Sequence, residues 1–161
     1  MPLVNDDRVC RVAMPPAARA HSTLSQIDYE DAFLVDVGPV EERTAEQWAR
    51  AILEDSPTSI RTSLMSGWRA IGLKVGSDES GQSVLGWQVR RCSPDFILLG
   101  ADSCIGLPGE LLFTRMRNAL LFNTFAQHGN LIARAVWAAT EPTHVRVVRY
   151  ILEQASRRLR P

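Results

Sequence analysis

Three arginines are prominent candidates for binding chemistry in this chain of 161 residues. Arg115, Arg117 and Arg134 lie among apolar residues, and a guanidinium inside an apolar pocket can fix a carboxylate or another oxyanion through a bidentate contact. The alternative is that these arginines are solvent-facing charges on a strand and a helix, because arginine is rarely buried without a partner. We retain Arg115 as a candidate ligand-binding residue.

His144 and Asp102 are the candidates for proton transfer. His144 lies just beyond Pro142 in a predicted helix, so its ring either faces a cavity as an acid or base or satisfies backbone groups that the proline frees. Asp102 lies in a predicted strand, which is an unusual position for a carboxylate unless it is at a sheet edge or in a polar pocket. We treat it as a weaker candidate for a general base.

The common enzyme and metal motifs are absent from the sequence. There is no serine nucleophile elbow, phosphate-binding glycine loop or dinucleotide fingerprint. His21 and His128 have no cysteine or second histidine at metal-ligand spacing, and Cys10, Cys92 and Cys104 lack such spacing as well. We therefore expect no metal and no cofactor, and a non-catalytic role is favoured over an enzymatic one.

Residues 29–37 are predicted to form the first strand. Polar and apolar side chains alternate imperfectly along this segment, and Tyr29, Asp31 and Phe33 share one side of it. The dipeptide Gly38-Pro39 ends the strand.

Two short helices are predicted after this strand. Thr44 and Gln47 have the spacing of a capping box, in which each side chain satisfies a free backbone donor of the other, so a helix begins there. A second helix is predicted over residues 58–68, because apolar residues recur there at helical spacing. The expected buried face of the first helix contains Trp48, Ala51 and Ile52, and that of the second contains Ile60, Leu64, Met65 and Trp68.

An antiparallel meander of four strands is predicted next. Its connections are short, which forces strands that are neighbours in sequence to pair. Each strand carries apolar side chains on both faces, so the inward and outward faces are only weakly assigned. Residues 71–75 are a further candidate strand. The four predicted strands are residues 84–92, 96–104, 110–117 and 119–128.

Residues 130–159 are predicted to form one long amphipathic helix. Residues 130–139 also alternate as a strand would, but alanine is the best helix former and the apolar stripe continues in phase beyond Pro142. Pro142 cannot donate to the carbonyl of Ala138 and is expected to kink the helix. The stripe consists of Leu131, Ala135, Ala138, Pro142, Val145, Val148, Leu152, Ala155 and Leu159.

This order of elements resembles the helix-grip superfamily, which includes START lipid-transfer domains, polyketide cyclases and pollen-allergen-like proteins (SRPBCC). The resemblance implies an α+β fold in which a curved antiparallel sheet wraps around a long kinked C-terminal helix and leaves a cavity for an apolar ligand. It implies no catalytic residues. More locally the chain resembles an uncharacterised bacterial family of that superfamily over Asp28-Tyr29-Glu30-Asp31-Ala32-Phe33, Gly86-Trp87, residues 129–137 and Pro142-Thr143-His144.

The large aromatic side chains are candidate walls of such a cavity. The alternative for each aromatic is that it only fills the core, as most buried aromatics do. The leading hypothesis is binding or carriage of a small hydrophobic ligand such as a lipid, an isoprenoid or a polyketide-like compound. The alternatives are an enzyme of cyclase or dehydratase type that uses the same cavity, and a protein-interaction module with a filled core. The candidate ligand-binding residues are Trp87, Phe113, Arg115, Phe122, Trp137 and His144.

The overall composition narrows the expected partners and location. The formal net charge is zero and no run of like charges occurs, so nucleic acid is not an expected partner. No segment has the length and apolarity of a membrane span or a signal peptide, and the cysteine count is odd, so we expect a cytoplasmic protein without integral membrane association. A homodimer is compatible with the sequence. We predict a flexible N-terminal arm over residues 1–24 and a single domain over residues 25–161.

Overall fold

A seven-stranded antiparallel sheet forms the centre of the described part of the chain. We describe a computed structural model over residues 8–76 and 82–160. The spatial order of the strands is β1-β2-β7-β6-β5-β4-β3, and every neighbouring pair is antiparallel. The strands are β1 (Val9–Arg11), β2 (Tyr29–Val35), β3 (Ser83–Val84), β4 (Trp87–Cys92), β5 (Phe96–Ala101), β6 (Gly109–Arg115) and β7 (Leu120–Ala126).

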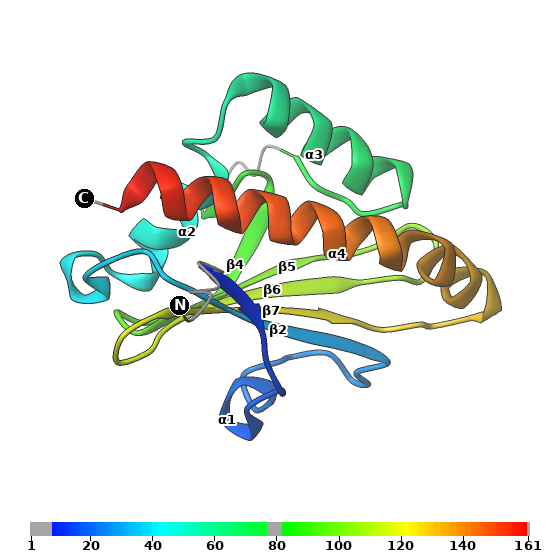
Figure 1. Cartoon of the computed structure of the whole chain (residues 1–161). Coiled ribbons are helices and arrows are strands. Elements are labelled where there is room, and N and C mark those ends of the chain that lie inside the picture. The colour runs from blue at the N-terminus through cyan, green and yellow to red at the C-terminus, as the bar shows by residue number, and fades with distance from the viewer. Residues whose placement is uncertain (1–7, 77–81, 161) are drawn as a thin grey trace, which may run out of the picture.

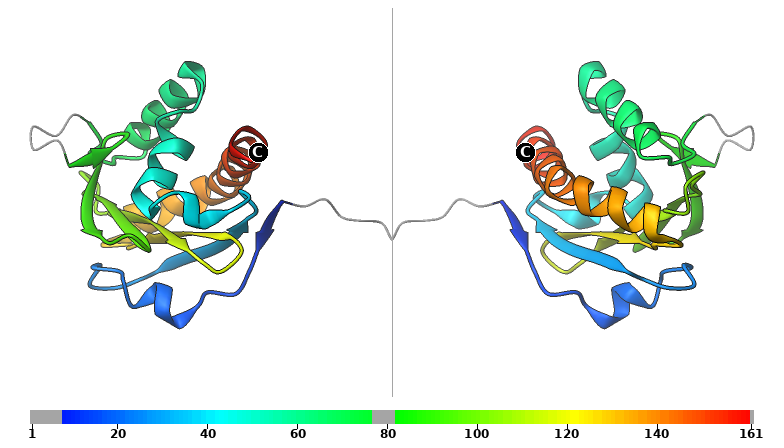
Figure 2. Two further views of the ribbon diagram at one scale, coloured as in Figure 1. Left: turned by 90° about the vertical axis from the view of Figure 1, so that its left-hand side faces the viewer. Right: turned by 90° about the vertical axis from the view of Figure 1, so that its right-hand side faces the viewer.

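Three helices cover one face of this sheet, as Figures 1 and 2 show. They are α2 (Ala45–Leu53), α3 (Thr58–Ala70) and the long C-terminal α4 (Leu131–Leu159). The capping box of Thr44 and Gln47 is present at the start of α2, as predicted. The fold class is therefore α+β, with two short helices between β2 and the rest of the sheet and one long helix at the C-terminal end.

The predicted strand over residues 84–92 is interrupted by a hairpin turn. Leu85 and Gly86 both have positive φ angles, of 45° and 84°, and Val84 pairs directly with Trp87. A two-residue turn of this kind matches the twist of antiparallel strands, and glycine adopts positive φ without strain. Residues 71–75 do not form a strand within the described chain. They contribute one isolated bridge, from Leu73 to Ser103.

The buried face of α4 differs from the predicted stripe in its first turns. Ala133 and Trp137 are buried there, whereas Leu131 is 81% exposed. The many alanines of this segment make its apolar face ambiguous, and the large Trp137 ring gains most from burial and so decides which face meets the sheet. Beyond Pro142 the stripe is as predicted at Val148, Leu152 and Ala155.

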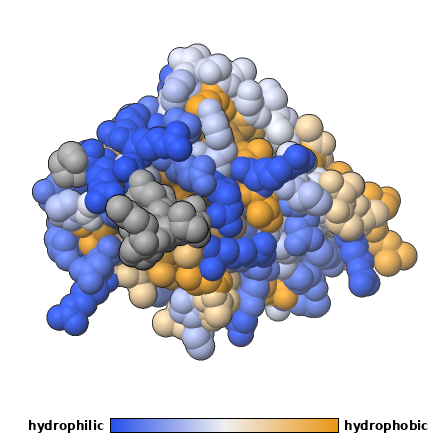
Figure 3. Space-filling view, viewed as in Figure 1, coloured by the Kyte–Doolittle hydropathy of each residue, from blue (hydrophilic) through white to orange (hydrophobic). Residues whose placement is uncertain are grey.

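Pro142 lies inside α4 and the helix continues through it. In Figure 1 the first turns of α4, drawn in yellow and orange, run in a different direction from the rest of the helix. This agrees with the predicted bend, since the proline ring removes one backbone hydrogen bond. Figure 3 shows that the surface at this end of α4 is apolar, and here Leu131 and Ile132 are 81% and 68% exposed.

Residues 8–24 are an integral part of the fold and not the flexible arm that the sequence predicts. Strand β1 pairs with β2, with Val9 opposite Val35. The short helix α1 (Pro16–Arg19) then crosses the sheet face opposite to α2, α3 and α4 (Figure 2). Ala18 of this segment is buried with Leu98, Leu112 and other side chains of that face. Residues 1–7 of the predicted arm lie outside the described residues.

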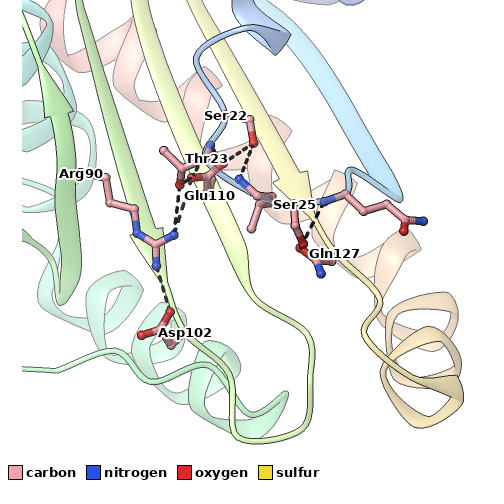
Figure 4. Close-up of polar contacts among 9 residues, drawn as sticks. Ser22, Thr23, Ser25, Arg90, Asp102, Glu110 and Gln127 are labelled. Atoms are coloured by element: carbon pink, nitrogen blue, oxygen red, sulfur yellow. Dashed lines mark hydrogen bonds and ion pairs between the residues drawn. The ribbon is translucent and has the colours of Figure 1, made fainter.

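A buried carboxylate fastens this N-terminal segment to the sheet (Figure 4). Glu110 of β6 is fully buried, and its Oε1 accepts a hydrogen bond of 2.5 Å from the Ser22 hydroxyl. Its Oε2 accepts one of 2.6 Å from the Thr23 hydroxyl and lies 3.7 Å from Nη1 of Arg90. Arg90 in turn pairs with the exposed Asp102 at 3.0 Å. Two hydroxyls, the backbone N–H of Thr23 and one guanidinium therefore compensate the buried charge.

Replacing Glu110 by glutamine is expected to lower the free energy of unfolding by about 1–3 kcal/mol. The amide nitrogen cannot accept a hydrogen bond, so at least one of the bonds that Ser22 and Thr23 donate to the buried carboxylate is lost. Urea denaturation measures the change. The control is Asp102→Asn, which removes an exposed partner of Arg90 and is expected to cost less than about 1 kcal/mol. Equal midpoints for Glu110→Gln and the wild-type chain would contradict this role of Glu110.

Candidate functional site

Two small cavities lie between the sheet and the helices. The first, here called the α4 cavity, has a volume of about 50 Å³, and the second, here called the tryptophan cavity, has about 40 Å³. Trp68 of α3, Leu111 of β6 and His144 of α4 line both cavities, so the two spaces are adjacent. The α4 cavity is also bordered by Leu64, Phe113, Phe122, Val147, Val148 and Ile151, and the tryptophan cavity by Leu73, Trp87, Leu107, Thr124, Ala126 and Trp137.

Five of the six predicted ligand-binding residues line these cavities. Trp87 and Trp137 border the tryptophan cavity, Phe113 and Phe122 border the α4 cavity, and His144 borders both. These residues come from β4, β6, β7 and α4, which the fold brings together on the inner face of the sheet. Phe113 and Phe122 are opposite each other in the sheet, and their rings pack edge to face at 5.1 Å.

Arg115, the sixth predicted residue, does not line either cavity. It occupies the end of β6 and donates to Oδ1 of Asp95 at 2.7 Å and to the backbone carbonyl of Arg43 at 3.0 Å. The alternation along β6 does direct Arg115 to the same face as Phe113, but its position at the strand end places its long side chain beside the segment that leads into α2. Its guanidinium therefore links two loops.

A hydrogen-bonded chain of three polar side chains lies beside the cavities. Asp31 of β2 has a fully buried side chain, and its Oδ2 accepts from the Tyr29 hydroxyl at 2.7 Å and lies 3.0 Å from Nε2 of His144. Its Oδ1 accepts from the backbone N–H of Thr124 at 3.0 Å. The ring of Trp137 packs against both Tyr29 and His144, with centroids at 4.7 Å and 5.1 Å. Asp31 thus fixes the orientation of His144.

The Tyr29 phenol is held in its protonated form. Burial raises the pKa of Tyr29 most, and the charge of Asp31 and the hydrogen bond to it raise this pKa further. Glu141 raises the pKa of Tyr29 slightly, while Arg11 lowers it. The phenol therefore keeps its proton, and its hydrogen bond to Asp31, above the pH at which an exposed tyrosine titrates.

Folding stability is expected to fall as the pH rises above about 10, the ordinary pKa of tyrosine. There the unfolded chain loses the Tyr29 proton while the folded chain keeps it, so the unfolded state binds fewer protons and is favoured. Urea midpoints between pH 8.5 and 11 measure the effect as the difference between the wild-type chain and Tyr29→Phe. The other titrating groups contribute equally to both proteins, so their contributions cancel in this difference and the remaining pH dependence is due to Tyr29. An identical pH dependence in both proteins would contradict the raised pKa.

Three buried polar atoms at the tryptophan cavity have no hydrogen-bond partner among the described residues. They are Nε1 of Trp87, Nε1 of Trp137 and Oγ1 of Thr124. Buried donors are almost always paired, so each such atom requires an explanation. All three belong to residues that line one small and mostly apolar space next to His144. Their shared position makes this space the candidate binding site.

The other predicted polar candidates lie away from the cavities. Asp102 is 76% exposed and pairs with Arg90, and Arg117 and Arg134 are exposed. His21 stacks on Phe96 at 4.0 Å. Within residues 8–76 and 82–160, no group of three or more histidine, cysteine or acidic side chains is arranged to hold a metal ion.

Tyr29, Asp31 and Thr124 belong to this site and were not among the predicted ligand-binding residues. The signal for Asp31 was present, because an acidic residue shares the inward side of a strand with Tyr29 and Phe33. A carboxylate in phase with buried apolar residues must be paired, and such pairs are frequent at functional sites. No comparable signal marks Thr124, whose role depends on its pairing opposite Asp31 in the sheet.

Comparisons with protein-family models, with curated proteins and with solved structures found no match for this chain. In the part of the chain that the structure describes, no helix combines the length and the apolarity that crossing a bilayer requires. Any function assigned to the chain therefore rests on the geometry of the site.

Proposed function

We propose that the chain binds a small, largely apolar molecule that carries an oxygen acceptor, in the space between the sheet and helices α3 and α4. The observation that supports this most directly is the set of three buried donors, from Trp87, Thr124 and Trp137, that lie beside His144 and have no partner within residues 8–76 and 82–160. The walls around them are apolar, so the ligand body would be hydrocarbon and its oxygen would meet the donors.

The chemistry of these donors selects the ligand group. An indole N–H only donates, and a threonine hydroxyl both donates and accepts. A carbonyl or carboxylate oxygen can accept from two or three such groups at once, which a hydrocarbon or an amine cannot do. A ketone or a short-chain carboxylic acid therefore fits the donor set.

The size of the cavities limits the ligand in the present arrangement. One molecule occupies roughly 30 Å³ in liquid water, and a cavity of roughly 150 Å³ accommodates benzene. Each of the two cavities alone therefore has room for little more than water. Trp68 of α3 lines both spaces, and Leu64 is the one buried residue of α3. A displacement of the Trp68 side chain or of α3 would enlarge this space. A lipid, an isoprenoid or a polyketide-like compound needs more room than a small ketone and therefore requires a larger displacement.

This proposal agrees with a helix-grip arrangement, which we retain as part of it. Support comes from the antiparallel sheet, the two helices between β2 and the meander, and the bent α4 across the inner face. In such an arrangement the ligand lies between the sheet and the long helix. The alternative of a protein-interaction module or homodimer stays a prediction, which light scattering of the purified chain tests.

Calorimetric titration with cyclopentanone and with hexanoic acid tests the proposed binding. For ligands of six to eight heavy atoms we expect a Kd of about 1 mM or below. Cyclohexane-type hydrocarbons without an acceptor are expected to bind more weakly, because they leave the three donors unpaired. Native mass spectrometry of the freshly purified chain complements the titration, and we expect a bound compound containing oxygen. A chain that is isolated empty and binds none of these probes would overturn the proposal.

A further inference from the structure

His144 has the geometry of a general base at the border of both cavities. Its Nε2 lies 3.0 Å from Oδ2 of Asp31, and since a carboxylate only accepts, a neutral His144 ring donates its proton there. The lone pair of the neutral ring is then on Nδ1, which makes no hydrogen bond within the described chain. The imidazole therefore presents a basic nitrogen on the side away from Asp31.

The three unpartnered donors complement this base. Trp87, Thr124 and Trp137 line the tryptophan cavity together with His144, and the Trp137 ring lies 5.1 Å from the His144 ring. Donors that are fixed in an apolar space and have no other partner stabilise a developing oxyanion strongly, because they need no reorganisation when the charge forms. A base and a set of oxyanion donors in one cavity are the two parts that enolisation of a carbonyl compound needs.

We propose that the chain catalyses proton transfer at carbon in a small ketone or enone, with His144 as the general base. The proposal rests on the binding function above and adds a reaction to it. Nδ1 of His144 removes a proton from the carbon beside the carbonyl group. The electron pair of the broken C–H bond forms the carbon–carbon double bond of an enolate, and the π pair of the carbonyl moves to its oxygen, where Trp87, Thr124 and Trp137 donate.

The imidazolium then returns the proton to carbon. Once the N–H of the imidazolium has exchanged with water, return to the same carbon places a solvent proton there. Return to the far end of a dienolate converts a β,γ-unsaturated ketone into its α,β-unsaturated isomer. Substrate and product have the same composition, so no oxidant, reductant or second substrate takes part. Asp31 is a positioning residue in this scheme, since it contacts His144 and stabilises the imidazolium but does not touch the ligand.

The test is loss of the α-protons of cyclopentanone in D₂O, followed by proton NMR. We expect the wild-type chain to exchange them about 100-fold faster than the same concentration of free imidazole. With His144→Ala or His144→Gln, the α-protons of cyclopentanone are expected to exchange no faster than with free imidazole. Two variants are used because the amide of Gln still donates to Asp31 and so preserves folding, which circular dichroism verifies.

Asp31→Asn tests the positioning role. This variant is expected to lower kcat at least 10-fold while KM for cyclopentanone changes little, since it disturbs the tautomer of His144 and not the ligand contacts. A purely structural role would change both constants together. Unchanged kcat in Asp31→Asn would overturn this role.

Binding by calorimetry separates this inference from the proposed function. Cyclopentanone that binds but exchanges no faster than with free imidazole overturns the catalytic proposal and leaves ligand binding intact. Exchange by His144→Gln at the wild-type rate overturns the role of His144. Cyclopentanone that neither binds nor exchanges overturns the catalytic proposal, and the binding function falls with it when hexanoic acid also fails to bind and the chain is isolated empty.

Discussion

Replacing Asp31 by alanine is expected to lower the free energy of unfolding by about 3–5 kcal/mol. The fully buried carboxylate accepts from the Tyr29 hydroxyl, the Thr124 backbone and His144, and its removal leaves these three groups without their acceptor. Urea denaturation of the wild-type chain and the variant measures the loss. Such a loss exceeds that of most single substitutions and would be a large part of the stability of a domain of this size.

The matched control for Asp31 is Glu30→Ala on the same strand. Glu30 lies on the opposite face of β2, is 27% exposed and pairs with the exposed Arg19. An exposed pair of this kind contributes about 0–1 kcal/mol, so the control is expected to unfold close to the wild-type midpoint. A loss for Asp31→Ala no larger than that for Glu30→Ala would show that the buried chain of polar residues does not stabilise the fold.

Replacing Leu111 by tryptophan is expected to weaken ligand binding about 100-fold, a change of about 2.7 kcal/mol. Leu111 lines both cavities, and the larger side chain would occupy the space that the ligand needs. Overpacking is expected to cost about 1–3 kcal/mol of stability, which leaves a folded protein to be measured. Calorimetric titration with cyclopentanone gives the Kd.

The control for Leu111 makes the same exchange of side chains at the surface. Leu131→Trp changes a residue that is 81% exposed and lies outside both cavities, so its Kd is expected to equal that of the wild-type chain. Equal Kd values for the two tryptophan variants would place the ligand somewhere other than the proposed space.

Local patterns predicted most of the elements on the inner face. The capping box of Thr44 and Gln47, the alternation along β2 and the long apolar stripe each reflect contacts between residues near in sequence. The N-terminal segment could not be predicted in this way. Its attachment depends on Glu110, which is 87 or 88 residues from its partners Thr23 and Ser22, and β1 has only three residues.

The candidate site was predictable in its walls and not in its polar centre. Aromatic residues at strand and helix positions indicated the walls, and Trp87, Trp137 and His144 do meet at one cavity. The pairing of Asp31 with His144 joins residues 113 positions apart, and no local pattern encodes such a contact. Arg115 was placed in the site because its residue type suits oxyanion binding, whereas its position at the end of β6 directs it to Asp95.

The indole N–H signals of the four tryptophans test the central claim most directly. Nε1 of Trp87 and Nε1 of Trp137 have no partner among the described residues, whereas Nε1 of Trp48 donates to the carbonyl of Val40 at 2.9 Å and serves as an internal control. In a ¹H–¹⁵N NMR titration with cyclopentanone, with signals assigned from tryptophan-to-phenylalanine variants, we predict that the Trp87 and Trp137 signals shift together and that the Trp48 signal does not move. Trp87 and Trp137 signals that stay unchanged at saturating probe, or that shift only as much as that of Trp48, would contradict ligand binding at this cavity.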